Sequence, residues 1–205
     1  MNTRYKLTNQ DLTTYNSFQW KLNEWKETSG EGELCTEGWL HCYSNPLLAI
    51  ILNHIHANIE KPKLFEVEVE GKCKTNFGLK EGWTRMRLVK ELALPEISLI
   101  QKVAFGILCT LEVYKEEKFI LWANNWLNGK DRSKESAAAA TYATYAAYYS
   151  ANAESAYAAR YAAAAAASNA AADDYYAYRA AYYAAVASYA NINLIKIAER
   201  CLEYK

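Results

Sequence analysis

Apolar and polar residues alternate along several short segments of residues 1–95, which is the pattern of strands with one buried face. The clearest segment covers residues 64–70, where Phe65, Val67 and Val69 alternate with three glutamates. Gly71 and Lys72 follow directly and predict a turn. Weaker alternation predicts further strands over residues 4–7, 18–25, 39–43 and 83–89.

Apolar residues recur at helical spacing in three other segments. The first predicted helix has Pro46 at its first position, directly after Ser44 and Asn45, either of which can cap it. A second helix is predicted to open at Pro95, and a third covers about residues 116–128. Short strands mixed with helices in this order indicate an α+β fold.

Residues 137–190 are almost a two-letter polymer, because 28 of these 54 residues are Ala and 12 are Tyr. Gly and Pro are absent from this tract, and Ala has the best intrinsic helix propensity. Polar residues cluster near its middle, so the pattern predicts two long helices, residues 136–167 and 172–204. Tyr142, Tyr145 and Tyr149 recur at three and four residues, as do Tyr175, Tyr178 and Tyr182, and each series forms a stripe on its helix.

These patterns divide the chain into three parts. Residues 1–95 form a small, strand-rich α+β domain that we expect to bind a ligand, and residues 96–134 form linking helices. Residues 135–205 form an Ala/Tyr-rich α-helical hairpin or bundle. Because small Ala faces let helices approach closely, we expect a homo-oligomer assembled through helices 136–204.

Composition excludes several classes of partner. The 23 basic and 23 acidic residues give a net charge of zero, so the chain lacks the basic excess of a nucleic-acid-binding protein. No apolar run approaches the ~20 residues of a membrane span. The five cysteines are irregularly spaced and the N-terminus lacks the apolar core of a signal peptide, so we expect reduced thiols and a cytoplasmic protein.

His41 is the first candidate for chemistry. On a strand it shares one face with Trp39 and Tyr43, and Ser44 follows, so an imidazole between two aromatic rings can contact a ligand. The alternative is a half-buried histidine whose ring hydrogen-bonds to a backbone carbonyl. Cys and His spacings match no zinc motif, so we expect no metal site.

Arg85 and Arg87 are the second candidate, because residues two apart on a strand point the same way and two guanidinium groups can hold one phosphate. The alternative is that they pair with Glu66, Glu68 and Glu70 on a neighbouring strand. A Walker loop, a dinucleotide fingerprint and a nucleophile elbow are absent, and so is a nucleophile with a base at recognisable spacing.

Several of these segments resemble a family of phage and bacterial proteins of uncharacterised function. The resemblance covers about residues 4–96 and is carried by Tyr5-Lys6, Cys35, the Gly38 to Cys42 segment, strand 65–71 and the Glu-Leu-Ala-Leu-Pro-Glu sequence at 91–96. Members of that family continue into Ala-rich repeats. This chain has Trp-Leu-His-Cys where the family has Phe-His-Ala-Cys, which moves the histidine by one position.

The segment Glu-Gly-Trp-Leu-His-Cys-Tyr-Ser at 37–44 is also similar to a segment of proteins with an ADP-ribosyltransferase-like fold. In those relatives this strand helps to form a pocket for NAD or ADP-ribose, and His41 and Ser44 are the corresponding positions. The resemblance implies a split, strand-rich α+β domain with a cleft suited to a nucleotide-ribose ligand. Against catalysis, Tyr5-Lys6-Leu7 lacks the histidine of the transferases' first motif.

Together these observations lead us to expect a phage accessory protein that acts against host defence. It would bind and sequester a nucleotide-derived small molecule, such as an immune signal of the ADP-ribose type, without catalysis and without a cofactor. The ligand-binding residues would be Tyr5, Trp39, His41, Tyr43, Ser44, Arg85 and Arg87. Two alternatives stay open: an ADP-ribosyltransferase-like enzyme that uses NAD, and a structural or protein-inhibiting module that acts through the Ala/Tyr helices.

Overall fold

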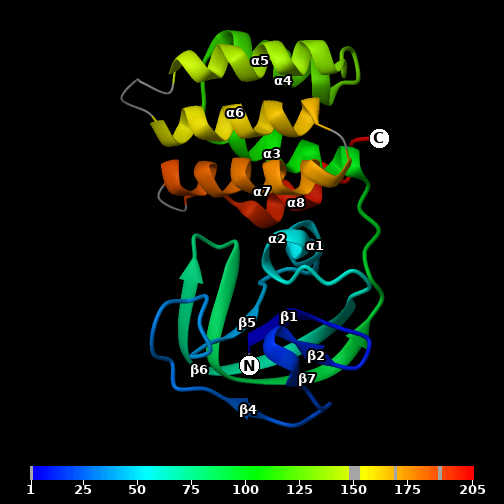
Figure 1. The fold of residues 1–205 in the computed structure, drawn as a ribbon, viewed down its shortest axis with the longest axis vertical. Coiled ribbons are helices and arrows are strands. Elements are labelled where there is room, and N and C mark those ends of the chain that lie inside the picture. The colour runs from blue at the N-terminus through cyan, green and yellow to red at the C-terminus, as the bar shows by residue number, and fades with distance from the viewer. Residues whose placement is uncertain (1, 148–152, 169, 189–190) are drawn as a thin grey trace. The chain divides into compact units, whose positions relative to one another are not determined.

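The protein is described here from a computed structural model, which describes residues 2–147, 153–168, 170–188 and 191–205. Contacts divide the chain into two compact units, Met1–Glu96 and Ile97–Lys205. The first unit holds the strands and two short helices, and the second is entirely helical where it is described (Figure 1). The predicted α+β class, with a strand-rich N-terminal part and Ala/Tyr-rich helices after it, is confirmed.

The first unit is built on an antiparallel sheet whose two long strands are neighbours in sequence. Its strands are β1 (Asn2–Thr8), β4 (Lys26–Glu27), β5 (Leu40–Cys42), β6 (Lys63–Asn76) and β7 (Lys80–Leu92). The pairing order is β1-β6-β7-β4, and β5 also pairs with β7. A smaller sheet pairs β2 (Thr13–Thr14) with β3 (Phe18–Gln19) across the 3₁₀ turn Tyr15–Ser17.

An additional bridge closes the main sheet on itself. Tyr5 of β1 pairs with Tyr43, directly after β5, through two backbone hydrogen bonds of 2.9 and 2.8 Å. The pairings therefore run β1-β6-β7-β5 and return to β1, which makes a small, closed ring of strands. Closure gives each of these four strands a partner on both sides over part of its length, which reduces the number of unpaired backbone groups at sheet edges.

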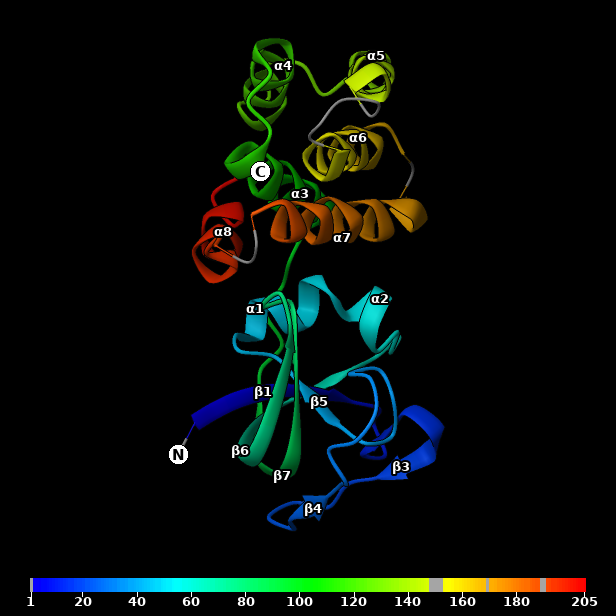
Figure 2. The same cartoon turned by 90° about the vertical axis from the view of Figure 1, so that its left-hand side faces the viewer.

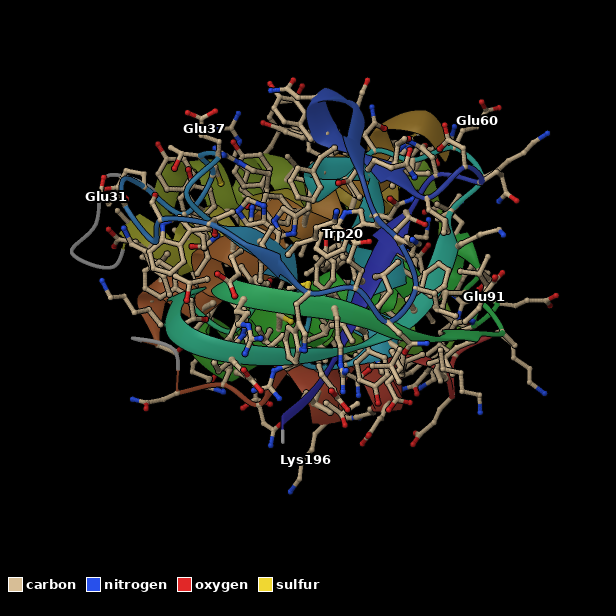
Figure 3. All side chains as sticks on the ribbon, turned by 90° about the horizontal axis from the view of Figure 1, so that it is seen from below. Trp20, Glu31, Glu37, Glu60, Glu91 and Lys196 are labelled. Atoms are coloured by element: carbon tan, nitrogen blue, oxygen red, sulfur yellow. The ribbon has the colours of Figure 1, made fainter. Side chains whose placement is uncertain are left out.

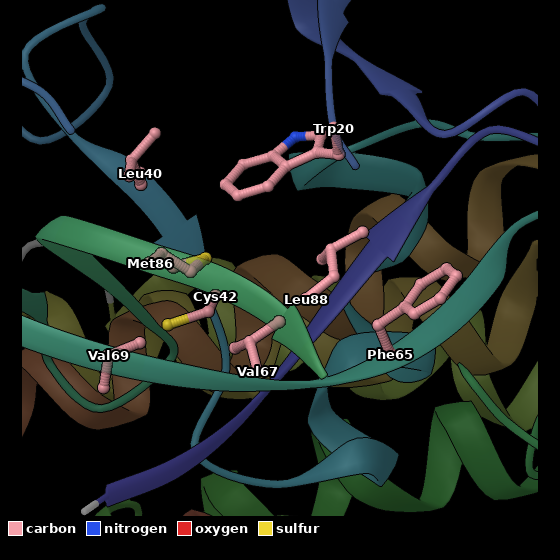
Figure 4. Close-up of a cluster of buried hydrophobic side chains, with 8 residues drawn as sticks. All are labelled: Trp20, Leu40, Cys42, Phe65, Val67, Val69, Met86 and Leu88. Atoms are coloured by element: carbon pink, nitrogen blue, oxygen red, sulfur yellow. The ribbon is translucent and has the colours of Figure 1, made fainter. Parts of the chain in front are cut away.

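The interior of this ring is the hydrophobic core of the first unit (Figure 4). Its buried members are Trp20, Leu40, Cys42, Phe65, Val67, Val69, Met86 and Leu88. The alternation predicted for residues 64–70 is confirmed, because Phe65, Val67 and Val69 are buried between half-buried glutamates. Trp20 points inward, whereas Glu31 and Glu37, in the loop before β5, extend outward (Figure 3).

Two short helices follow β5. In α1 (Pro46–Ile51), the Asn45 side chain accepts a hydrogen bond from the backbone N–H of Leu47 at 2.8 Å, so Asn45 is the cap. A second helix, α2 (Asn53–His56), follows directly, and α1 packs against β1.

Two sequence predictions for this unit are wrong. Gly71 and Lys72 do not turn the chain, because the Lys72 N–H donates to Thr84 Oγ1 at 3.0 Å and the pair forms a β-bulge inside β6. Gly71 takes a φ of +85°, which a bulge accepts as readily as a turn. The strand predicted for residues 18–25 is limited to Phe18–Gln19, since Phe18 and Leu22 are exposed and Trp20 alone is buried.

The second unit consists of six helices in its described parts. These are α3 (Leu99–Val113), α4 (Glu117–Leu127), α5 (Lys134–Ala147), α6 (Ala153–Ala167), α7 (Ala170–Ala187) and α8 (Leu194–Cys201). Pro95 does not open α3, because Ser98 and Gln101 form a capping box three residues later. Contacts group α3 and α4 with the helices that follow. None of the described helices is long and apolar enough to cross a membrane.

The Ala/Tyr tract forms three helices rather than the two predicted. Helices α5, α6 and α7 lie beside one another, so the chain reverses between α5 and α6 (Figure 2). Because the chain reverses, the Ala faces of α6 and α7 are covered by neighbouring helices. Ala158, Ala162 and Ala180 are fully buried as a result. A single 32-residue helix would have left one such face in water, so burial overrides continuous helix propensity.

Tyrosine rings fill the space along α6 and α7 within one chain. Tyr157 stacks on Tyr183 with centroids 4.8 Å apart, and Tyr161 stacks on Tyr183 at 5.5 Å. Arg179 lies over Tyr161 at 5.2 Å and donates to the Tyr183 hydroxyl at 2.9 Å. Tyr142 is 80% exposed. Of the predicted first stripe, Tyr149 and the side chain of Tyr145 lie outside the described residues.

Candidate functional site

The structure brings the predicted residues of β1 and β5 together. Tyr5 and Tyr43 are directly paired, and His41 lies two residues before Tyr43 on β5. Trp39 and Tyr43 are buried, whereas Tyr5, His41 and Ser44 are half-buried. The predicted aromatic surface around His41 is therefore largely covered by the protein itself.

His41 is neutral, and its tautomer is fixed. Its Nε2 is hydrogen-bonded to the carbonyl oxygen of Leu34, and because a carbonyl can only accept, Nε2 carries the proton. Burial lowers the pKa of His41 to about 4; the Leu34 carbonyl raises it by less, and the positive charges of Lys6 and Lys80 lower it further. Nδ1 therefore presents a bare lone pair.

Lys6 lies inside the ring of strands and is only 7% exposed. Its Nζ donates to the backbone oxygen of His41 at 2.7 Å and lies 4.6 Å from the centroid of the Trp20 ring. Burial lowers the pKa of Lys6 to about 8, against a smaller raising effect of Cys42 and with a further lowering by Lys80. The ammonium has a carbonyl and an aromatic face as partners, and no carboxylate forms an ion pair with it among residues the structure describes.

Lys80, at the start of β7, is the second nearly buried ammonium and is also 7% exposed. Its Nζ donates to Sγ of Cys35 at 3.1 Å. Over the described ranges this thiol is its single hydrogen-bond partner, and no carboxylate lies within ion-pair distance. The positive charge of Lys80 lowers the pKa values of Lys6, His41 and His56, so the four side chains lie within electrostatic range of one another. We call Lys6, His41, His56 and Lys80 the basic cluster.

His56, at the end of α2, stacks on Tyr43 with ring centroids 5.9 Å apart. Burial lowers the pKa of His56 to about 3, with smaller contributions from Lys80 and His41. The stack joins the basic cluster to the aromatic residues of β5. His54, in contrast, faces Asn58 on the exposed side of the same helix.

Close packing of the loop before β5 holds these residues in place. Trp39 Nε1 donates to the Gly32 oxygen at 3.1 Å. A Cβ at Gly82 would lie 2.4 Å from Cδ1 of Leu34 and 3.0 Å from Cβ of Trp39. Gly82, which pairs with His41, must therefore lack a side chain for the loop to lie over β7.

Arg85 and Arg87 are paired with carboxylates. Arg85 contacts Glu70 and also Glu27, the latter at 2.9 Å, and Arg87 Nε donates to Glu68 at 2.7 Å. Both guanidinium groups also lie over the ring of Trp25, at 4.3 and 4.9 Å. These contacts correspond to the cross-strand role that the sequence left open as the alternative to phosphate binding.

A third charged group, on the core side, is also paired. Arg4 Nε contacts Glu81 Oε2 at 2.6 Å, and Trp83 Nε1 donates to the same oxygen at 2.8 Å. This neutralised pair differs from Lys6 and Lys80, which contact neutral groups instead. Lys6 and Lys80 are therefore two nearly buried positive charges that no carboxylate compensates among the residues the structure describes.

Sequence reasoning missed Lys6, Lys80 and His56 as members of the site. Alternation in the first strand gave no sign that a lysine faces inward. The bridge between Tyr5 and Tyr43 makes the Lys6 side chain point inward, and a pairing between residues 38 apart leaves no local signal in the sequence.

A hollow of about 480 Å³, lined by residues including Asn9, Asp11 and Lys61, contains none of the predicted site residues. Within the described ranges no three His, Cys, Asp or Glu side chains are grouped as metal ligands.

Comparison with known proteins adds one similarity. No curated protein and no solved structure is significantly similar to the chain. Residues 2–100 match the model of a family described as a domain of unknown function, DUF7666. The first unit and the short segment after it are therefore similar to a family whose function is uncharacterised.

Proposed function

We propose that the first unit binds a phosphate-bearing, nucleotide-derived small molecule at the basic cluster. The observation that carries the proposal is the pair of nearly buried ammonium groups, Lys6 and Lys80, which the described part of the chain leaves without a carboxylate. The pKa values of Lys6, His41 and His56 are all strongly lowered, and perturbed groups concentrated at one place are typical of binding and catalytic sites.

Electrostatics favour an anion here. Leaving a buried charge without a counter-charge costs about 3–5 kcal/mol, and a bound phosphate would remove much of that cost. Lysine is a common phosphate ligand, and three donors on each ammonium leave room for further hydrogen bonds. Arg85 and Arg87 would join such a site only by exchanging Glu70 and Glu68 for the ligand.

We infer from the residues around the basic cluster that the ligand also carries a nucleoside part. His41, with a bare Nδ1, accepts a hydrogen bond from a ribose hydroxyl, and Ser44 and Tyr5 lie at the same end of β5. Similarity of residues 37–44 to ADP-ribosyltransferase-like proteins favours a ligand of the ADP-ribose type. Trp39 and Tyr43 would contact it only at their edges, because both are buried.

In the cell, such a protein would sequester an immune signal. We propose that it is a phage accessory protein that acts against host defence in the cytoplasm of the host. That context rests on the family resemblance of residues 4–96. Sequestration needs affinity but no chemistry, so the proposal assigns no catalytic role to His41. Turnover of NAD by the purified protein would move the proposal to an ADP-ribosyltransferase-like enzyme.

Self-association through the helices is a second proposal. Tyr142 on α5 is exposed, so its ring is available to a second copy, whereas the rings of Tyr157 and Tyr183 are stacked within the chain. Sedimentation velocity across a concentration series tests it, and Tyr142→Ser should lower the association. A strictly monomeric chain would contradict this second proposal and leave the ligand site untouched.

Calorimetric titration with ADP-ribose, NAD and cyclic dinucleotides tests the ligand site. Lys80→Met should weaken binding about ten- to a hundredfold, because a charge-assisted contact contributes about 1.5–3 kcal/mol. Lys72→Met is the matched control, since it removes the same charge from an exposed position of the same hairpin. The control should bind as the wild type does. Equal weakening by both changes, or no binding to any of these ligands, would refute the proposal.

A further inference from the structure

Cys35 and Lys80 are in direct contact, and the proposed ligand site gives this contact no chemical role. The thiol of Cys35 is exposed to solvent, and the Lys80 Nζ lies 3.1 Å from its sulfur. Lys80 is itself more than nine-tenths buried, and its side chain ends at this sulfur. An accessible sulfur is thus held against a nitrogen that has no other hydrogen-bond partner in the described structure.

We propose that this pair is an oxidation site, at which a peroxide links Cys35 to Lys80 covalently and reversibly. Exposure of the thiol lets the oxidant reach it, and the fixed nitrogen then competes with further oxidation of the sulfur. The distance of 3.1 Å is already that of two atoms in contact, so little movement is needed to form the link.

The chemistry balances with hydrogen peroxide as the oxidant. One peroxide converts the thiol to a sulfenic acid and releases one water. The Lys80 ammonium first releases one proton to water. The neutral amine then attacks that sulfur, the S–OH bond breaks, and the hydroxyl takes one N–H proton and leaves as a second water. The sum is one thiol, one amine and one peroxide giving one S–N bond and two waters, in which sulfur is oxidised and peroxide is reduced.

A second peroxide can oxidise the neutral Lys80 amine to a hydroxylamine, in which a new N–O bond replaces the broken O–O bond and one water is released. The hydroxylamine oxygen then attacks the sulfenic sulfur, the S–OH bond breaks, and the hydroxyl leaves as water with the hydroxylamine proton. In that case one thiol, one amine and two peroxides give one S–O–N link and three waters. Both forms join the same two residues, and an excess of thiol reductant returns both to cysteine and lysine. Either form also removes the positive charge of Lys80, because its nitrogen is then bonded to sulfur or oxygen.

Peptide mass spectrometry of the full-length protein after peroxide treatment tests the link. Trypsin does not cut after a modified lysine, so the linked product joins residues 27–63, which contain Cys35, to residues 75–85. The expected mass is the sum of the two peptides less two hydrogen atoms, with or without one added oxygen. Fragmentation must place the link on Cys35 rather than on Cys42, which is buried.

The controls are drawn from the same chain. Cys73 is exposed as well, but its sulfur contacts the backbone oxygen of Lys74 and, among residues that the structure describes, no ammonium nitrogen, so it should proceed to sulfinic acid without a link. Cys35→Ser and Lys80→Arg should both abolish the linked peptide, and a thiol reductant should release it in the wild type. Oxidation of Cys35 to sulfinic acid as fast as Cys73, with no linked peptide, would overturn the inference.

Discussion

Mild acid should destabilise the first unit through two histidines. His41 and His56 have pKa values of about 4 and about 3 in the folded protein, against 6.5 for an ordinary histidine. Because both folded values are depressed, the stability they contribute is fully present above pH 6.5 and is lost as the pH falls toward 4. Unfolding at pH 5 therefore takes up nearly one proton at each ring.

The size of the effect follows from these values. Between pH 7 and pH 5 the linkage relation gives a loss of about 2 kcal/mol for each histidine, or about 4 kcal/mol together. Domains have total stabilities of only ~5–15 kcal/mol, so this is a large fraction. All three histidines of the chain lie in residues 41–56, so the second unit contains none and should not share this dependence.

Urea unfolding followed by tryptophan fluorescence at pH 7 and pH 5 measures the loss. His41→Gln and His56→Gln should each reduce the pH-dependent part by about half. His54→Gln is the matched control, because His54 is exposed on the same short helix, and it should leave the pH dependence unchanged. A total loss under ~1 kcal/mol, or an equal effect of all three substitutions, would refute the reasoning that these two half-buried rings are neutral in the folded protein.

Further substitutions test other parts of the structure. Lys6→Met should raise the free energy of unfolding by about 1–3 kcal/mol at pH 7. This gain should shrink as the pH rises from 8 to 10.5, because Lys6 of the wild type loses its proton at lower pH in the folded state than in the unfolded state. Urea unfolding across this pH range measures the gain and its pH dependence, and a loss of stability at pH 7 would contradict the account of Lys6. Gly82→Ala should cost about 1–3 kcal/mol by thermal melting, because the new methyl meets Leu34, and an unchanged melting temperature would contradict that contact. Gly106→Ala should also destabilise, although Ala is the better helix former, since a Cβ there would lie 3.1 Å from the Cα of Ala177 on α7; a rise in melting temperature would show that α3 and α7 can separate.

Local pattern determined much of the secondary structure. Alternation at Phe65, Val67 and Val69 placed the inward face of β6, and the Asn45-Pro46 pair placed the start of α1, because these signals act over a few residues. Helical propensity likewise identified the Ala/Tyr tract as helix. The turn expected at Gly71 was wrong because a positive φ suits a bulge as well as a turn.

Tertiary structure alone decided the composition of the site. Sequence placed His41 on a strand between aromatic residues, and that strand is present, but the lysines beside it come from β1 and from the far end of the β6-β7 hairpin. Tyr5 and Tyr43 close the ring and thereby turn Lys6 inward, whereas Arg85 and Arg87 meet carboxylates across β6. Reversals within the Ala/Tyr tract depend in the same way on which apolar faces find cover. Pairing between distant residues depends on the free energy of the whole fold, and no local pattern of side chains encodes it.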